Sequence, residues 1–201
     1  APYNYSDTNS YITGNGHVRI FENISGSWTQ IGQDIDGEIT SSSGRSGTSV
    51  SLSSDGSIVA IGAPRNTSDT SGGSFSQGHV RIFENISGSW SQIGQDIDGE
   101  GNNNESGSSV SLSSNGSIVA IGAPYNDGNG SFNGHVRIYE NTSGFWSQIG
   151  QDIDGEAADD FSGYSVSLSS DGNTVAIGGP NNDGNGSNSG HVRIYENIGG
   201  T

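Results

Sequence analysis

The chain repeats itself along nearly its whole length. The phrase Gly-His-Val-Arg-Ile occurs four times, and successive copies lie 62, 56 and 56 residues apart. The phrases Ile-Gly-Gln-Asp-Ile-Asp-Gly-Glu and Ser-Val-Ser-Leu-Ser-Ser each occur three times, in a fixed order relative to the first. A period of this length restricts the fold to architectures in which one supersecondary unit stacks on the next and buries a core only with its neighbours.

The repeats differ in length only within stretches rich in Ser, Asn and Gly. Divided at the Ala-Pro boundary, the chain gives repeat 1 at 1–62, repeat 2 at 63–122, repeat 3 at 123–178 and a partial repeat 4 at 179–201. Repeat 1 is expected to start within a structural unit, after the second strand of that unit.

Each structural unit contains four strand signals. Residues 49–54 and 57–63 are alternating or apolar runs separated by Asp55-Gly56, which is a strong hairpin signal. Residues 78–84 and 90–97 supply a third and a fourth strand. No segment has a useful helical period. The sequence predicts an all-β fold of tandem four-stranded antiparallel blades of β-propeller type, about three and a quarter blades, without helices.

The units resemble the FG-GAP repeat of the integrin α-subunit propeller, and most closely the bacterial and algal variant with a Trp-x-Gln-x-Gly phrase. The matching residues are Gly-Ala-Pro at 62–64 and 122–124, the Gly-His-Val-Arg-Ile strand, and the glycine before the first strand at Gly47, Gly107 and Gly163. The Phe of the Phe-Gly pair has its nearest counterpart at Phe161. The family's calcium loop between strands one and two is replaced by an Asp-Gly or Asn-Gly turn, so the resemblance implies no calcium there.

The charge of the chain excludes several classes of partner. It carries 22 acidic and 6 basic side chains, with a net charge of −16. Such a field repels nucleic acid and anionic lipid and attracts cations, so we expect calcium, no other cofactor, and no nucleic-acid partner. No apolar run is long enough for a membrane span, so we expect no membrane insertion. The absence of Cys fits an extracellular or cell-surface protein.

Two groups of oxygen-bearing side chains are candidate calcium ligands. Carboxylates end the fourth strand at alternate positions and could share one side of it, although they could also form a solvated strand end matched in part by arginines. Two Asn-Asp-Gly-Asn-Gly-Ser loops space their oxygens like the start of a calcium loop, although Asn and Gly also simply form turns. The tentative ligands are Asp34, Asp36, Glu38, Asp96, Asp98, Glu100, Asp152, Asp154, Glu156, Asp127, Asn129, Asp183 and Asn185.

The third strand of each blade carries a His-x-Arg pair on one face. The four histidines could form a ring that binds a metal ion. We favour a second interpretation, in which His and Arg lie between blades and pair with carboxylates of the neighbouring blade. The histidines are His17, His79, His135 and His191.

Two further sets of repeated residues suggest ligands or modification. Tryptophans open the fourth strand and could stack against a sugar, but we expect them to pack within the blades. Sequons recur in the turn between strands three and four, where glycosylation would be possible in a secreted eukaryotic protein. The residues are Trp28, Trp90 and Trp146 for stacking, and Asn23, Asn85 and Asn141 for glycosylation.

The sequence therefore favours an extracellular structural or adhesive repeat protein, which contributes blades to a larger propeller or to a self-assembling surface fibre. Its expected partners are copies of itself or the remainder of a longer repeat chain, because open blade edges need cover. The alternative is a carbohydrate-binding, lectin-like propeller with glycans as partners. We expect no enzymatic activity, because no catalytic constellation breaks the repeat symmetry.

Overall fold

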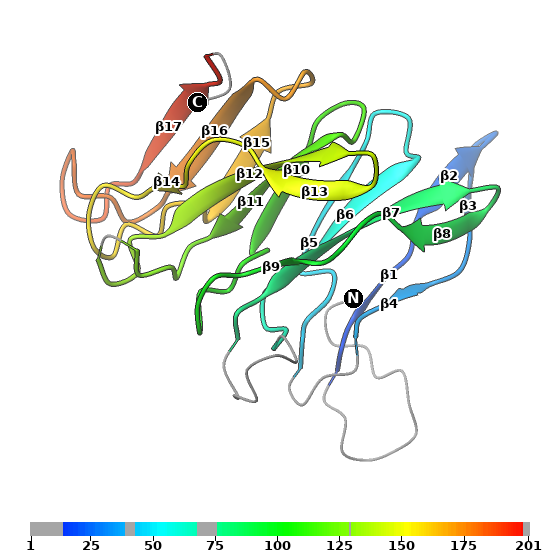
Figure 1. The fold of residues 1–201 in the computed structure, drawn as a ribbon, viewed down its shortest axis with the longest axis horizontal. Helices are drawn as coiled ribbons and strands as arrows, with labels where there is room; N and C mark the ends of the chain where they lie inside the picture. Colours follow the sequence, from blue (N-terminus) through cyan, green and yellow to red (C-terminus); the bar gives the residue numbers. More distant parts are fainter. Residues whose placement is uncertain (1–13, 39–42, 68–75, 129, 199–201) are drawn as a thin grey trace.

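The computed structural model describes residues 14–38, 43–67, 76–128 and 130–198. Throughout these residues the regular structure is antiparallel β-sheet, and the described part of the chain contains no helix. The sheets follow one another in a row, from β1–β4 at one side of Figure 1 to β15–β17 at the other. This arrangement confirms the predicted all-β fold of successive blades.

Two blades have the full set of strands, and each is flanked by a partial one. The first full blade has the order β5-β6-β7-β8 with β9 also paired to β7, and the second has the order β10-β11-β12-β13 with β14 also paired to β12. The partial blades hold β1–β4 and β15–β17. The strands of the first half are β1 (His17–Val18), β2 (Phe21–Ile24), β3 (Ser27–Gln30), β4 (Ile35–Asp36), β5 (Ser49–Leu52), β6 (Ile58–Ala63), β7 (His79–Ile86), β8 (Ser89–Gln92) and β9 (Ile97–Asp98). The remaining strands are β10 (Ser109–Leu112), β11 (Ile118–Ala123), β12 (His135–Thr142), β13 (Phe145–Gln148), β14 (Ile153–Asp154), β15 (Ser165–Leu168), β16 (Thr174–Gly179) and β17 (His191–Glu196).

The sequence repeats and the sheets divide the chain at different places. The expected boundary between repeats 1–62 and 63–122 falls within β6, so β5 and β6 belong to one sequence repeat while their partners β7 to β9 belong to the next. Each blade is therefore assembled from two successive sequence repeats.

The Asp-Gly hairpin between β5 and β6 forms as predicted, but its loop is longer than two residues. Gly56 has a φ of +73° and donates its N–H to the Ser53 oxygen over 3.0 Å. The Asp55 carboxylate accepts hydrogen bonds from the Ser57 N–H and, at 2.7 Å, from the Ser53 hydroxyl. The Ser57 N–H, followed by the two hydroxyls, lowers the pKa of Asp55 to about 2.

The predicted fourth strand at 90–97 is two strands, which corrects the sequence expectation. Both β8 and β9 pair with the same edge of β7. Between them the Ile93 N–H bonds to the Ile82 oxygen, and Gly94 then adopts a φ of +71°. That conformation suits glycine and turns the chain out of the regular strand before Asp96.

The hydrophobic core lies between successive blades, because the strands have period two. On β7, Val80 and Ile82 point toward the following blade, whereas Arg81 and Phe83 face the preceding one. Each interface is therefore filled from both sides. The interface between the two full blades buries Ala60, Val80, Ile82, Ile97, Val110, Leu112, Val119, Ile121, Tyr139 and Trp146.

Hydrogen bonds at the first strand of each full blade fix the position of one blade relative to the next. The Ser49 hydroxyl donates to the Gly107 oxygen over 2.7 Å, and the Leu112 N–H donates to the Ser51 hydroxyl over 2.9 Å. A Cβ added to Gly62 would collide with the Gly107 oxygen of the next blade. The blades approach closely here because Gly62 has no side chain.

Candidate functional site at the blade interfaces

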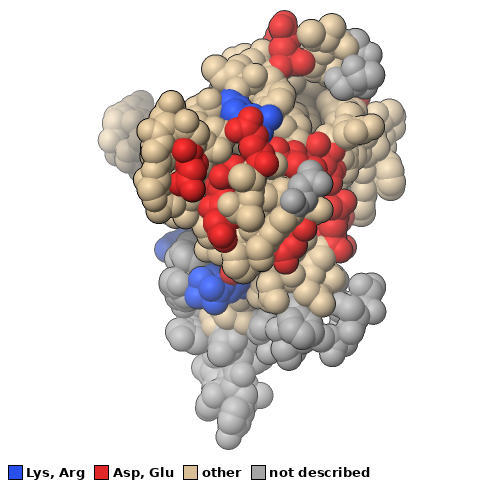
Figure 2. Space-filling view, turned by 90° about the vertical axis from the view of Figure 1, so that its left-hand side faces the viewer, with Lys and Arg blue, Asp and Glu red and all other residues tan. Residues whose placement is uncertain are grey.

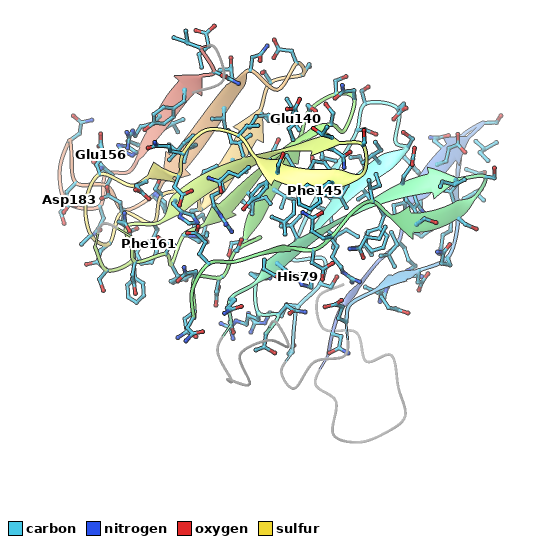
Figure 3. All side chains as sticks on the ribbon, in the orientation of Figure 1. His79, Glu140, Phe145, Glu156, Phe161 and Asp183 are labelled. Atoms are coloured by element: carbon cyan, nitrogen blue, oxygen red, sulfur yellow. The ribbon has the colours of Figure 1, made fainter. Side chains whose placement is uncertain are left out.

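The site is built around the first residue of the third strand in each full blade. His79 begins β7 and His135 begins β12, and each imidazole is buried to a relative exposure of 2 %. The His79 Nδ1 lies 3.6 Å from the Asp96 carboxylate and 3.7 Å from the Glu38 carboxylate. Figure 3 shows His79 inside the row of sheets, among the side chains between neighbouring elements.

The two carboxylates beside His79 come from different blades. Asp96 belongs to the same blade, in the segment after the Gly94 kink, and accepts a 2.6 Å hydrogen bond from the Gln92 amide. Glu38 follows β4 of the preceding blade and accepts a 3.3 Å hydrogen bond from the Asn66 amide. The linker that runs from Asp96 to Glu100 supplies one carboxylate to each of two successive groups, since Asp96 lies at His79 and Glu100 at His135.

The same arrangement recurs one blade further along. His135 Nδ1 lies 3.5 Å from the Asp152 carboxylate, and Gln148 donates a 2.7 Å hydrogen bond to Asp152. Glu100 from the preceding blade completes the group. In both groups the nitrogen and oxygen atoms that could hold a metal ion lie within 4.8 Å of one another. Two successive interfaces therefore carry the same His, Asp and Glu constellation.

Burial sets the ionisation of these histidines. It lowers the pKa of His79 to about 4, opposed by the Asp96 carboxylate and reinforced by Arg81. It also lowers the pKa of His135 to about 4, reinforced by Arg137 and opposed by Asp152. Both imidazoles are therefore neutral at neutral pH and keep a lone pair available.

The arginines beside the histidines link neighbouring blades. Arg81 donates a 2.7 Å hydrogen bond to the Asp36 main-chain oxygen, and Arg137 makes an equal bond to the Asp98 oxygen. Arg137 also lies 3.5 Å from the Glu100 carboxylate. The favoured interpretation of the His-Arg pairs agrees with this geometry, because both side chains lie between blades and face groups of the neighbouring blade.

The calcium prediction requires the three carboxylates of each acidic triplet to lie together. The structure does not bring them together. In Asp96, Asp98 and Glu100, the first turns to His79 of its own blade and the last joins His135 of the next. Burial raises the pKa of the Asp98 carboxyl, and the main-chain oxygen of Asp98 accepts a hydrogen bond from Arg137. The third triplet divides in the same way, since Asp152 lies beside His135 of its own blade and Glu156 lies beside His191 of the next. In the first triplet, Glu38 lies beside His79 of the next blade.

The two Asn-Asp-Gly loops use their oxygens internally. Asp127 accepts the Phe132 N–H over 2.8 Å, and Asp183 accepts the Asn188 N–H over 2.6 Å. Asn185 is exposed, and Asn129 lies outside the described residues. These bonds are those of turns, which is the alternative the sequence left open.

Figure 2, which views the side of the molecule that carries the C-terminal blade, shows many acidic side chains and few basic ones.

The tryptophans correct the carbohydrate-stacking alternative. Trp90 and Trp146 are only 4 % and 2 % exposed, so neither ring has a face available to a sugar. Their indole N–H groups donate to the Ile31 and Ile93 oxygens of the preceding blade, each over 2.9 Å. Trp28, in the partial blade that holds β1–β4, is 70 % exposed.

The repeated sequons are also not equivalent. Each Asn side chain accepts an N–H from the glycine three residues later, as in Asn85 with Gly88 over 2.9 Å. The amide nitrogens of Asn85 and Asn141 are buried. A glycan attaches to that nitrogen, so glycosylation at these two positions would require the side chain to leave the orientation it has in the structure. Asn23 is exposed, and its glycosylation stays a prediction.

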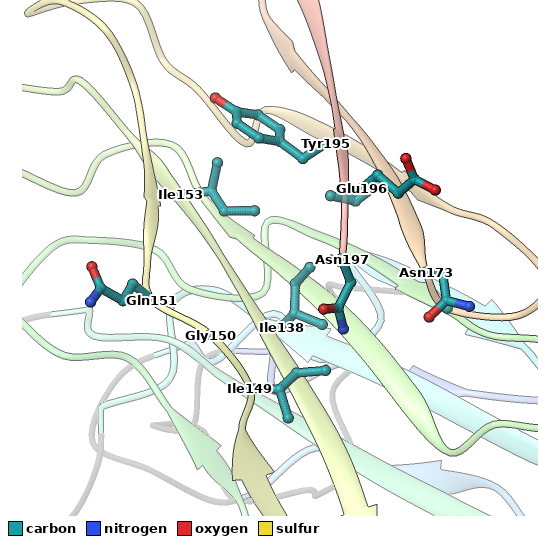
Figure 4. Close-up of a pocket in the computed structure, with 11 residues that line it drawn as sticks. Ile138, Ile149, Gly150, Gln151, Ile153, Asn173, Tyr195, Glu196 and Asn197 are labelled. Carbon is teal, nitrogen blue, oxygen red and sulfur yellow. The ribbon is translucent and has the colours of Figure 1, made fainter. Parts of the chain in front are cut away.

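The structure reveals a pocket that the sequence expectations did not include. A pocket of about 140 Å³ is lined by Ile149, Gly150 and Gln151 of one blade and by Val175 and Tyr195 of the next. Figure 4 shows Ile138, Ile149, Ile153 and Tyr195 around this pocket together with polar side chains such as Asn173 and Asn197. The equivalent residues Ile93, Gly94 and Gln95 surround Trp146, so this pocket corresponds to the space that a tryptophan fills one blade earlier. We call the pocket at Ile149, Gly150 and Gln151 the tryptophan slot. The sequence carries a signal for this slot, since the Ile-Gly-Gln phrases at 31–33 and 93–95 each contact the Trp of the following blade.

Comparison with known proteins agrees with this architecture. Residues 152–195 match the model of the FG-GAP repeat. No curated protein matches the sequence. A solved structure described as a 6-phosphogluconolactonase from Bacteroides uniformis ATCC 8492 is similar at a TM-score of 0.61 and 12 % identity, covering 92 % of this chain and 46 % of the other. A periplasmic gluconolactonase of Pseudomonas aeruginosa gives a TM-score of 0.50 and 16 % identity, covering 94 % and 47 %.

These likenesses correct the expectation that the chain has no enzymatic activity. Both solved structures carry the names of enzymes, so a row of similar blades is no ground for excluding catalysis. The chain spans about half the length of each of them, and at such identities the likeness shows the fold alone.

The described residues include no helix that is long and apolar enough to cross a membrane. The chain is a repeat protein of β-propeller-type blades, and one of its repeats, at 152–195, matches the FG-GAP repeat.

Proposed function

We propose that the chain is a structural repeat unit of an extracellular assembly, in which its terminal blades are covered by further blades of the same repeat, either from a longer repeat chain or from copies joined end to end. One observation carries this proposal: both ends of the row expose side chains whose equivalents are buried between the interior blades. The acidic composition and the absence of Cys support an extracellular location.

The N-terminal end face, defined here by Phe21, Trp28, Val50 and Leu52, is apolar and exposed. Its equivalents Phe83, Trp90, Val110 and Leu112 in the two full blades are buried, and the contrast is largest for tryptophan, with 70 % exposure at Trp28 against 4 % at Trp90. Covering one such aromatic side chain contributes about 1.5–3 kcal/mol. The face therefore matches the surface that a preceding blade of the same repeat would cover.

The C-terminal end face, defined here by Val192 and Ile194 on β17, has the complementary character. Ile194 is 70 % exposed, whereas its equivalent Ile82 is fully buried against the following blade. The tryptophan slot at Ile149 to Gln151 lies beside the same terminal blade. Trp28 is the exposed tryptophan of the described residues, and it lies on the opposite end face.

The contact joins two different faces, so it is heterologous and leaves one face of each type free at the ends of any growing assembly. Such contacts close into rings or continue as filaments, according to the rotation between copies. Covering the terminal blades also protects the exposed strand edges from uncontrolled pairing. A surface fibre or a larger propeller built from blades of this repeat is the expected product.

The experiment is sedimentation and negative-stain electron microscopy of the 201-residue chain over a range of concentrations. We expect rings or filaments in the wild type and a shift toward single copies in Trp28→Ala. Phe145→Ala is the matched control, because Phe145 is 61 % exposed on β13 but belongs to neither end face. A wild-type chain that stays monomeric at all concentrations, or equal loss of assembly in both variants, contradicts the proposal.

A further inference from the structure

We propose that each interior blade interface carries a binding site for a divalent transition-metal ion. The ligands would be the buried His Nδ1, the Asp of the same blade and the Glu of the preceding blade. The two sites are Glu38–His79–Asp96 and Glu100–His135–Asp152.

The distances within the first group fit ligands of a common ion better than they fit direct hydrogen bonds. His79 Nδ1 lies 3.6 and 3.7 Å from the two carboxylates, which is beyond hydrogen-bond distance. Two ligands at about 2.0–2.1 Å from a tetrahedral ion lie roughly 3.3–3.4 Å apart. The two distances from the His79 Nδ1 to the carboxylates exceed that separation by only a few tenths of an ångström.

The donor set selects the class of metal. Calcium prefers six to eight oxygen ligands, whereas an imidazole nitrogen with carboxylates suits zinc and its neighbours. Each histidine is held by burial at the start of a paired strand, so its nitrogen is fixed toward the carboxylates. The proposed ion is therefore zinc-like, and this replaces calcium as the expectation for these carboxylates.

Supporting hydrogen bonds hold the carboxylates in place, as outer partners do in metal sites. Gln92 bonds one oxygen of Asp96, and Asn66 bonds Glu38, while Gln148 does the same for Asp152. In the last blade, His191 Nδ1 lies 3.7 Å from Glu156, and no third ligand is found there among the described residues. Two complete sites are thus expected in the described part of the chain.

An ion at this position would join two blades, because Glu38 and His79 belong to different ones. Its binding would stabilise the interface by mass action, since the site exists only when both blades are folded and packed. The proposal concerns the stability and order of the blade row and stands apart from the end-to-end assembly proposed above.

The test is metal titration of the chelator-treated chain. We expect the wild type to bind two Zn²⁺ ions per chain. In Asp96→Asn/Asp152→Asn we expect the loss of both Zn²⁺ ions, Co²⁺ binding at least tenfold weaker than in the wild type, and loss of the visible absorption of bound Co²⁺. Glu84→Gln/Glu140→Gln is the matched control, because it removes the same charge from exposed residues of β7 and β12. In the wild type, Zn²⁺ should also shift the ¹⁵N resonances of the Nδ1 atoms of His79 and His135, which needs no variant.

Three outcomes would overturn the proposal. The first is the absence of Zn²⁺ binding by the folded wild type. The second is equal loss of binding in the control variant, which would show that only the general negative charge attracts the ion. The third is displacement of Zn²⁺ by equimolar Ca²⁺, which would exclude the imidazole as a ligand. Thermal unfolding of each variant without metal identifies any that fail to fold.

Discussion

The indole N–H of Trp146 donates to the main-chain oxygen of Ile93, on the preceding blade, over 2.9 Å. The bond is supported by Gln95 of the same phrase, whose side chain bonds both the N–H and the oxygen of the Trp146 main chain. Trp146 therefore binds the preceding blade through both its indole ring and its main chain. Trp90 repeats these contacts with Ile31 and Gln33.

Replacing Trp146 by Ala should lower the free energy of unfolding by about 3–5 kcal/mol, because it removes a fully buried aromatic side chain and leaves a cavity. Trp28→Ala should change the stability of the single copy by about 0.5 kcal/mol or less, since that ring is exposed. Urea unfolding of both variants at low protein concentration measures the difference. Equal losses would contradict the assignment of Trp28 to an uncovered face.

Gly62→Ala should destabilise the chain by about 1–3 kcal/mol, because the added Cβ would meet the Gly107 oxygen across the interface. The control is Gly44→Ala, whose Cβ would lie 3.7 Å from Asn66 in ordinary contact. Thermal unfolding followed by circular dichroism separates the two. If Gly62→Ala unfolds at the same temperature as Gly44→Ala, the blades are not in close contact at Gly62.

The stability of the chelator-treated chain should fall as the pH decreases from about 6.5 to about 4. His79 and His135 have a folded pKa of about 4, below the ordinary value of 6.5, so the unfolded chain binds more protons across this window. Each unit of difference in pKa corresponds to about 1.4 kcal/mol. Urea unfolding at several pH values measures the slope, and a flat profile between pH 6.5 and 4 would contradict the burial of these imidazoles.

A further loss of stability should follow at lower pH from the hairpin aspartates. The pKa of Asp55 is lowered to about 2, and that of Asp171 is lowered as well, chiefly by hydrogen bonds from neighbouring Ser and main-chain N–H groups. Their contribution is present above about pH 4 and is lost as the pH falls toward 2. Asp55→Asn should remove part of this loss, because the equivalent hairpin between β10 and β11 already carries Asn115 and keeps the same bonds.

The sequence predicts the blades well because their hairpins are local. The Asp55-Gly56 turn and the period-two pattern on either side of it depend on neighbouring residues, and the structure pairs those strands. The resemblance to FG-GAP repeats also agrees with the match at 152–195.

The candidate site could not be predicted in the same way, because its residues meet across a blade boundary. Glu38 and Asp96 stand at different places in two copies of one phrase, and only the kink at Gly94 and the stacking of blades bring both to His79. A period-two reading of that phrase instead placed three carboxylates together. The tryptophan slot was missed for the same reason, since Ile93 and Trp146 belong to successive units.

The measurement that tests the central claim most directly is acrylamide quenching of tryptophan fluorescence as a function of protein concentration. Trp28 is the exposed tryptophan, while Trp90 and Trp146 are buried, so the accessible emission reports on the N-terminal end face. End-to-end joining predicts that this accessible fraction disappears as assemblies form. A Trp28 that remains fully quenchable at concentrations where copies are associated would show that its face is not covered, and would contradict the account.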